Sequence, residues 1–364
     1  MCPSSSLAPA RPSQLERSGR LSKDCLPSRR AIIQTSCLIP GAGFQPPGTG
    51  VTRLCYIPAM YAPQQPVPRR SRGRRWLGHL FREWTIESWR KIAPAFAKPE
   101  PSKWSETQVT LAWLGHSTVL INFFGVTILT DPALFPRVGI RLPGITIGPK
   151  RLTAPALLFD GLPQIDLILL SHAHFDHLDL RTLRCFDETT RVITARATGD
   201  LLKRTRFSNI TELNWGESKI LSAAAGEMVI AAFPVKHWGA RTQHDSYRGY
   251  NGYLIERRGR RILFAGDTAM TERFAALRRH GPIDVAIVPI SAYNPWIQSH
   301  STPEQAVQMA TAAGARFIVP VHHQTFRLSF EPFREPIERL QATLSKTPER
   351  IALREIGETF VLPL

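Results

Sequence analysis

The hydrophobic residues of this chain follow a regular pattern only from about Gln108 onward. There they form short runs rich in β-branched and aromatic residues, separated by turns that contain glycine. Runs of this length and composition are typical of strands. The pattern predicts ten strands, over residues 110–114, 118–122, 126–130, 166–170, 192–194, 228–234, 252–256, 261–265, 285–290 and 317–321.

Stretches with helical spacing alternate with the later strands. The one that begins at Thr302-Pro-Glu-Gln305 has a good helix start, with a cap residue, a proline in the first turn and an early acid. Strands with helices interspersed in both halves predict one layered α/β domain over residues 104–364. The predicted helices span residues 197–206, 271–279, 302–313 and 332–344.

Residues 1–68 differ from the rest of the chain. They contain eleven prolines and four of the five cysteines, and no sustained hydrophobic period. We interpret them as a disordered leader. Two alternatives are a transit peptide, suggested by the Arg- and Ser-rich, acid-poor composition, and a start site at Met60 that would make the upstream residues a mis-assigned extension.

The positive charge is concentrated in the N-terminal part. Residues 1–103 carry 17 Lys and Arg against 5 Asp and Glu, whereas residues 104–364 carry 29 against 24. A dedicated nucleic-acid module in the domain is therefore not expected. Residues 69–103 form a basic amphipathic arm, whose segment 69–84 either lies on an anionic membrane surface or docks on the domain.

The cysteines and the hydropathy of the chain indicate where in the cell the protein is located. Only Cys185 lies in the domain, and no C-x-x-C spacing occurs, which favours a reducing compartment and argues against a zinc finger. No apolar run reaches the length of about 18 residues that a membrane span requires. We expect a cytoplasmic protein with peripheral contact at the membrane.

The richest chemistry lies in SHAHFDHLD, residues 171–179, directly after the buried strand 166–170. In an extended segment alternate residues point the same way, so His172 and His174 can hold one metal ion while Phe175 turns into the core. Asp176 and His177 then face a neighbouring position. Imidazole and carboxylate ligands suit Zn²⁺ best, although Fe, Mn and other divalent metals also accept them.

Further ligands follow three other predicted strands. His237, Asp267 and His322 each stand just after the end of an apolar run, at the edge where layered α/β folds gather their sites. Gly266 allows the backbone before Asp267 to approach the ions closely. The domain therefore supplies enough ligands for two metal sites.

The order of these motifs resembles that of the metallo-β-lactamase superfamily: HxHxDH, then a His, then Gly-Asp-Thr, then a His. WLGHSTV (113–119), TDP (130–132), PISAYNP (289–295) and HxxPEQA (300–306) resemble its branch of N-acylphosphatidylethanolamine-hydrolysing phospholipase D and bacterial relatives. The resemblance covers residues 104–364. It implies a four-layer αβ/βα sandwich with mixed sheets and the site at one edge.

The resemblance also implies roles for the residues. One Zn²⁺ would be held by His172, His174 and His237, and the other by Asp176, His177 and His322. Asp267 would bridge both ions together with a hydroxide, and Asp176 and Asp267 count with His300 as the catalytic residues. His300 would protonate or polarise the leaving group, or alternatively orient the substrate.

Several residues near the predicted ligands have supporting or outlying positions in this scheme. His116 could border the cavity, and Asp131 could support a ligand histidine. His323 is not expected to be a ligand, because neighbours at a strand end point apart, and it stands in HHQTF where the branch tends to have HWGTF. The loop after Asp131 offers either an apolar entrance or core packing through Phe135, Pro136, Ile140 and Leu142.

These motifs predict a dinuclear zinc hydrolase, most simply a phospholipase D-type phosphodiesterase acting on an N-acylphosphatidylethanolamine-like lipid or another phosphodiester. A lactonase resembling ascorbate-phosphate lactonases and a nuclease resembling ribonuclease Z are the alternative enzymes. A scaffold that has lost catalysis is disfavoured, because such a role would not require all seven ligands. The phospholipase branch also implies a homodimer.

Overall fold

The computed structural model describes residues 89–223 and 226–363. Expectations for the leader (1–68) and for the membrane-facing segment of the arm (69–84) lie outside these residues. Residues 93–97 of the arm pair with the domain, through hydrogen bonds of the Ala93 amide to the Leu152 carbonyl and the Ala97 amide to the Ile356 carbonyl. No helix within the described ranges is long and apolar enough to cross a bilayer.

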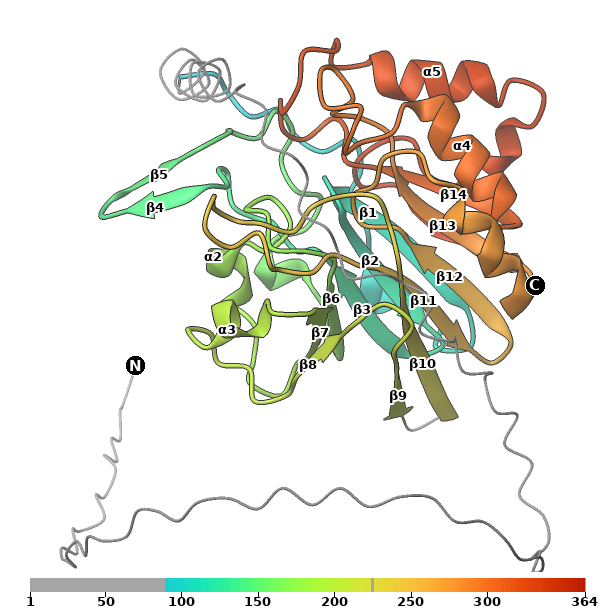
Figure 1. Cartoon of the computed structure of the whole chain (residues 1–364), viewed down its shortest axis with the longest axis horizontal. Helices are drawn as coiled ribbons and strands as arrows, with labels where there is room; N and C mark the ends of the chain where they lie inside the picture. The colour runs from blue at the N-terminus through green and yellow to red at the C-terminus, as the bar shows by residue number, and fades with distance from the viewer. Residues whose placement is uncertain (1–88, 224–225, 364) are drawn as a thin grey trace, which may run out of the picture. The chain divides into compact units, whose positions relative to one another are not determined.

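Each of the ten predicted strands forms, and they assemble with others into two mixed sheets (Figure 1). In the first sheet, β15, β1, β2 and β3 pair antiparallel, whereas β3, β6, β7 and β8 pair parallel. Its strands, in spatial order, are β15 (Thr359–Val361), β1 (Val109–Gly115), β2 (Thr118–Phe123), β3 (Val126–Thr130), β6 (Leu167–Leu170), β7 (Arg191–Ala195) and β8 (Ile210–Leu213).

The second sheet also combines parallel and antiparallel strand pairs. Its first three strands pair parallel and the remaining ones antiparallel. In spatial order they are β14 (Ala315–Val321), β13 (Ile283–Pro289), β12 (Arg260–Phe264), β11 (Gly252–Arg257), β10 (Gly226–Phe233) and β9 (Ser218–Ala223).

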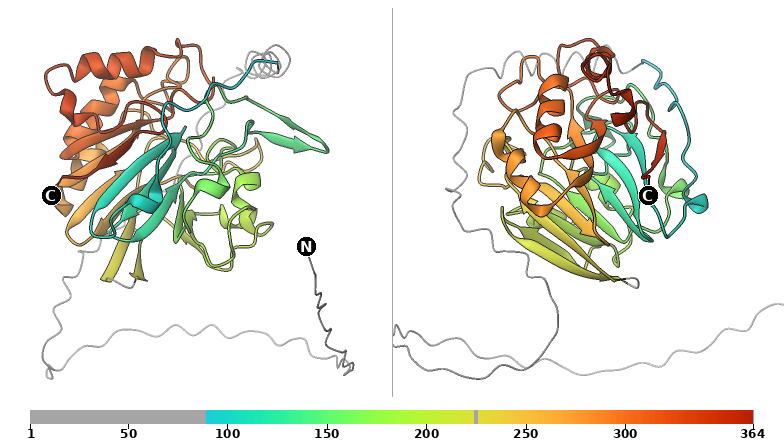
Figure 2. Two further views of the ribbon diagram at one scale, coloured as in Figure 1. Left: turned by 180° about the vertical axis from the view of Figure 1, so that it is seen from behind. Right: turned by 90° about the vertical axis from the view of Figure 1, so that its right-hand side faces the viewer.

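Alternation along the strands of the second sheet separates two hydrophobic cores. In β12, Ile262 and Phe264 point toward the core shared with the first sheet, whereas Leu263 points toward the helices. Because both faces are covered, these strands are apolar at nearly every position. The layers are therefore helix, sheet, sheet, helix, the four-layer sandwich that was expected (Figure 2).

The helices match their predictions unevenly. α4 (Pro303–Ala312) forms as expected, with a reciprocal capping box between Thr302 and Gln305. α5 (Glu335–Thr343) starts three residues later than predicted, and residues 271–279 give the 3₁₀ helix η3 (Glu272–His280). The described part also contains three short 3₁₀ helices and the short α-helix α2: η1 (Pro101–Lys103), η2 (Phe159–Gly161), η4 (Pro348–Arg350) and α2 (Leu180–Leu183).

The helix predicted over residues 197–206 is wrong in extent. Only one turn forms, α3 (Gly199–Leu202). The hydroxyl of Thr198 donates to the Ala195 carbonyl instead of accepting a helix amide, and the turn has no side-chain cap. Asp200 is instead engaged by Arg248, at 2.5 Å.

A two-stranded ribbon leaves the body of the domain between β3 and β6. It consists of β4 (Ile140–Leu142) and β5 (Ile145–Ile147), joined by a turn at Pro143 and Gly144. Figures 1 and 2 show it projecting away from the two large sheets. The sequence pattern had indicated only a loop in this region.

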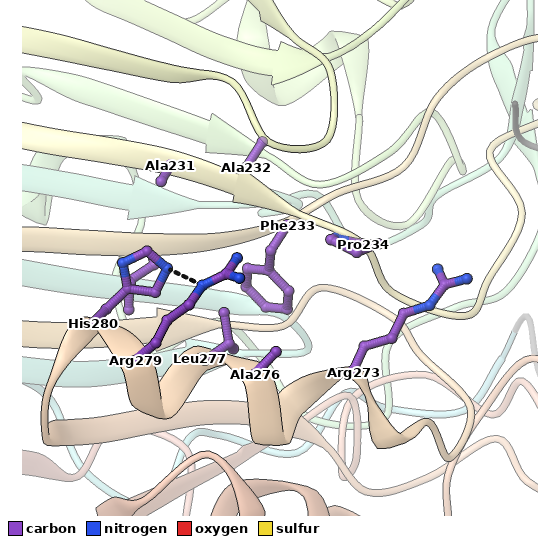
Figure 3. A pocket seen from close by; sticks show the side chains of 10 residues that line it. Ala231, Ala232, Phe233, Pro234, Arg273, Ala276, Leu277, Arg279 and His280 are labelled. Carbon is purple, nitrogen blue, oxygen red and sulfur yellow. Dashed lines mark hydrogen bonds between the residues drawn. The ribbon is translucent and has the colours of Figure 1, made fainter. Parts of the chain in front are cut away.

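A small hollow opens between β10 and η3 (Figure 3). Phe233 and Leu277 form its floor, and Arg273, Arg279 and His280 stand at its rim, where Arg279 Nε lies 3.4 Å from His280 Nε2. It shares no residue with the histidine cluster described below.

Candidate metal centre

The segment SHAHFDHLD connects the end of β6 to the start of α2. The amides of His177 and Leu178 both donate to the His174 carbonyl, so the chain turns sharply after His174. Asp179 ends the segment as the N-cap of α2, accepting from the amides of Arg181 and Thr182. The turn is what places the two pairs of candidate ligands on neighbouring sides.

The second sheet contributes the other ligands at its strand ends. Asp267 follows β12 after Gly266, whose φ is +59°, and a Cβ there would lie 2.5 Å from Ser171 Cβ. Only glycine therefore lets the β12 end come so close to the β6 end. His237 follows β10, and His322 follows β14 with a φ of 67° and its amide bonded to the His116 carbonyl.

Asp267 lies at the centre of the cluster. Its Oδ2 atom is within 4.0 Å of a ring nitrogen of five histidines. The distances are 3.1 Å to His177 Nε2, 3.1 Å to His322 Nε2, 3.8 Å to His237 Nε2, 3.9 Å to His300 Nδ1 and 4.0 Å to His172 Nε2. A carboxylate in this position can bridge two metal ions.

Among the described residues the candidate ligand atoms form four overlapping groups, within each of which the atoms lie within 4.8 Å of one another. The two smaller groups are Asp131, His172 and His177, and Asp267, His300 and His322; the two larger ones contain the predicted ligands. One larger group is His172, His174, His237 and Asp267, as the sequence predicted. The other larger group is Asp176, His177 and His322, joined by His116, whose Nε2 lies 2.9 Å from Asp176 Oδ2. The structure thus brings together all seven residues predicted as ligands.

Hydrogen bonds at the far ring nitrogen orient several of these histidines. His177 Nδ1 lies 2.6 Å from Asp131 Oδ2, and His237 Nδ1 lies 2.8 Å from the Ser299 carbonyl. His172 Nδ1 lies 2.8 Å from Ser171 Oγ. In each ring Nε2 is therefore left to face the centre, which is how metal-binding histidines are commonly supported.

The electrostatics of the cluster favour ligand protonation states. Burial lowers the pKa of His174 to about 3 and that of His237 to about 4, so both rings are neutral near pH 7. Burial alone would raise the pKa of Asp267, but the positive charges of His177 and His322 hold it well below its usual range. Neutral imidazole and ionised carboxylate are the forms that bind metals.

Two rings behave in the opposite way. Burial alone would lower the pKa of His177, but Asp267, Asp176 and Asp131 raise it well above its usual value. The same balance, with Asp267 as the main opposing charge, raises the pKa of His322 to about 9. These two protons compensate the buried carboxylates, a task that metal cations would perform in their place.

The polar atoms at the centre fit a metal site. Buried atoms at the centre without a hydrogen-bond partner among the described residues include His177 Nε2, His322 Nε2 and Asp267 Oδ1. Native proteins rarely leave so many buried polar atoms unsatisfied in one place. Imidazole nitrogens and carboxylate oxygens in this number suit Zn²⁺, and also Fe and Mn.

The remaining predicted residues have separate positions. His300 lies beside the centre, 12% exposed, and its Nδ1 is buried without a hydrogen-bond partner among the described residues. His323 lies outside both groups, and its ring stacks on Trp113 at 4.5 Å. Phe175 does not enter the core as expected: it is half-buried, with the Arg241 guanidinium 4.1 Å above its ring.

Sequence reasoning did not identify two neighbours of the centre, Arg241 and Trp238. Arg241 Nη1 donates to the carbonyls of Ala173 and Leu178, which holds the ligand segment at both sides of its turn. Trp238, which is 45% exposed, packs its ring 4.6 Å from that of His174. Trp238 directly follows the predicted ligand His237, and this neighbourhood in the sequence could have identified it. The sequence around Arg241 contains no comparable signal.

Comparison with known proteins is consistent with this geometry. Residues 127–323 match the family model described as beta-lactamase superfamily domain. An uncharacterized protein of Mycobacterium tuberculosis is 32% identical over 274 residues, covering 72% of this chain and 71% of that protein. N-acyl-phosphatidylethanolamine-hydrolyzing phospholipase D 1 of Caenorhabditis elegans is 31% identical over 252 residues, covering 65% and 70%.

A solved structure supports the fold. Igni18, a metallo hydrolase from Ignicoccus hospitalis, has a TM-score of 0.54 and 22% identity, covering 71% of this chain and 100% of that one.

Proposed function

The chain belongs to the beta-lactamase superfamily and is a metal-dependent hydrolase, and from this premise we propose that it cleaves a phosphodiester of an N-acylphosphatidylethanolamine-like lipid. The bond broken would be the one that phospholipase D enzymes hydrolyse, between the phosphate and the head-group alcohol. The products would be a phosphatidic acid and an N-acylethanolamine.

The observation that carries the proposal is the position of Asp267 between the two ligand groups. His172, His174 and His237 would hold one divalent cation, and Asp176, His177 and His322 the other. Bound there, two cations lower the pKa of a water and offset the charge that develops at the attacked phosphorus. We propose zinc for both sites, because the donors are imidazoles and carboxylates.

His116 and Asp131 would support the second group from outside. The ring of His116 lies 4.3 Å from that of His322, and its Nε2 donates to Asp176 Oδ2 at 2.9 Å. Asp131 is buried and accepts from the amide and hydroxyl of Ser171 as well as from His177. Both would fix ring orientations without touching the substrate.

His300 is the residue we propose for the leaving group. Burial lowers its pKa well below the usual value, which favours the neutral ring. A neutral imidazole donates one N–H hydrogen bond, so His300 would polarise the departing oxygen rather than transfer a proton as an imidazolium. The side chain of His300 is 12% exposed, whereas that of Asp267 is 2% exposed.

The choice of a lipid phosphodiester rests on similarity to the C. elegans phospholipase, with which this chain shares 31% identity over 252 residues. The test is mass-spectrometric product analysis of the zinc-loaded full chain with N-acylphosphatidylethanolamine. We expect phosphatidic acid and N-acylethanolamine from the wild type and none from Asp267→Asn. Metal content and circular dichroism of both proteins establish that the comparison is between folded chains.

Other outcomes separate the alternatives. No product from a chain that carries two metals would reject the lipid substrate. Turnover of a lactone without turnover of any phosphodiester would favour a lactonase, and salt-sensitive RNA cleavage by the full chain would favour a nuclease. Iron or manganese in the active protein, with zinc inactive, would reject only the choice of metal.

A further inference from the structure

The β4–β5 ribbon presents a continuous apolar face. In its register Ile140 pairs with Ile147 and Leu142 with Ile145, so all four aliphatic side chains lie on the same side. They are 37–56% exposed. The pair Arg141 and Thr146 lies on the opposite side, where Thr146 Oγ1 accepts from the Arg181 guanidinium at 3.1 Å.

Such a ribbon is not stable by its own contacts. A two-stranded hairpin is marginal in water unless one face is packed against something. Here the face toward the domain is the polar one, held through Arg181, and the apolar face is directed away. The arrangement therefore indicates that another molecule or a membrane surface covers the aliphatic face.

The base of the ribbon is rigid. Gly139 and Gly148 have φ values of +136° and +149°, and a Cβ on either would collide with the carbonyl oxygen of the opposite strand. The two strands therefore lie unusually close to each other where they leave the domain. Before this point Leu134 donates its amide to Thr182 Oγ1 at 2.9 Å, which ties the entry strand to α2.

The exit of the ribbon leads back to the metal centre. Arg151 forms a β-bridge with Phe326, whose ring lies 5.1 Å from that of His116. The segment that leaves the ribbon is thus connected, through Phe326, to a neighbour of the second ligand group.

Charge identifies the partner. Residues 132–159 contain four cationic residues and no acid; Arg137, Arg141 and Lys150 are exposed or partly exposed, whereas Arg151 is buried. Lys150 is close enough to Arg137 and Arg90 that their charges, after burial, lower its pKa. A symmetric contact with a second copy would place this cationic segment against itself, whereas an anionic surface would neutralise it.

We propose that the β4–β5 ribbon inserts its aliphatic face into the surface of an anionic phospholipid bilayer. Ile140, Leu142, Ile145 and Ile147 enter the boundary between headgroups and acyl chains, and the partly exposed Arg137 and Lys150 at the base meet the lipid phosphates. The docking would bring a lipid phosphodiester to the proposed catalytic centre and in that respect rests on the proposed function, but the docking itself requires no turnover.

The test is flotation of the full chain with vesicles of phosphatidylcholine containing about 30% phosphatidylglycerol and no N-acylated lipid. We expect the wild type to float and Leu142→Ser/Ile145→Ser to bind roughly tenfold more weakly. Ile220→Ser/Val361→Ser is the matched control, because those aliphatics are 53% and 46% exposed on β9 and β15. We expect this control to float like the wild type.

Three results would overturn the proposal. Equal flotation of the ribbon variant and the wild type would assign binding to another surface, such as residues 69–84. Equal binding to vesicles of phosphatidylcholine alone would remove the role of charge. Conversion of a dimer to a monomer by the ribbon substitutions, measured by light scattering without lipid, would make the ribbon a contact between copies. Thermal melts verify that each variant is folded, and product analysis in the separate assay reports on the proposed function independently.

Discussion

Replacement of Asp131 by Asn should weaken the second metal site while leaving the fold intact. The carboxylate accepts three hydrogen bonds: from the Ser171 amide at 2.7 Å, the Ser171 hydroxyl at 2.5 Å and His177 Nδ1 at 2.6 Å. In Asp131→Asn one oxygen remains for the Ser171 amide, and an NH₂ group replaces the oxygen that faces His177.

The consequence is a change of tautomer. An NH₂ group cannot accept from His177 Nδ1, so Nδ1 must become the acceptor and the ring proton must move to Nε2. That atom lies 3.1 Å from Asp267 Oδ2, in the direction of the metal centre, and a protonated Nε2 cannot bind a metal. Loss of such an outer partner typically reduces metal affinity about 10–100-fold, which corresponds to about 1.4–2.7 kcal/mol.

Competition with a chelator, followed by metal analysis, measures this loss. We expect the site of His177 to release its metal first, while the site of His172 and His174 changes less. Asp166→Asn is the matched control, because that exposed carboxylate accepts only from the Thr127 amide, at 2.8 Å, near the start of the same strand. Wild-type affinity at both sites of a folded Asp131→Asn protein would refute the reasoning.

Three further predictions follow from the geometry of the centre. Gly266→Ala should lower the free energy of unfolding by about 2–4 kcal/mol in urea titrations, because its Cβ would lie 2.5 Å from Ser171 Cβ at a φ of +59°; an unchanged midpoint would contradict this. The metal-free chain should release protons when it binds zinc at pH 7, because the pKa of His322 is raised to about 9 and that of His177 is also raised. For the same reason the affinity for zinc should rise with pH up to about 9. Calorimetry in two buffers of different ionisation enthalpy measures the release, and identical uncorrected heats in the two buffers would oppose it. Arg241→Met should reduce turnover roughly tenfold and lower metal content, because two carbonyls of the ligand segment lose their donor; full metal content with normal turnover would show that the segment holds its shape unaided.

The parts of the structure that the sequence predicted are those fixed by strong local signals. Most positions of the ten strands are buried, and β1, β13 and β14 are buried on both faces, so their apolar runs admit few other conformations. The helix after Thr302 has its own capping box, and the SHAHFDHLD segment contains four candidate ligands within six residues. Such features need no knowledge of distant residues.

The parts that were missed depend on tertiary contacts. β8, β9 and β15 each lie at a sheet edge or have partly exposed positions, so their alternation is weak. The ribbon over residues 140–147 lacks a covered face, and its aliphatics were interpreted as an entrance or as core. The role of Arg241 follows only from the fold, because it lies far along the chain from the carbonyls that it binds.

The division of the ligands between two sheets has a consequence for biosynthesis. His172 to His177 follow β6 of the first sheet, whereas His237, Asp267 and His322 follow strands of the second sheet, which are synthesised later. A nascent chain that has folded only the strands up to β6 possesses only part of the candidate centre. The proposed two-metal site would therefore be complete only after the second sheet has docked.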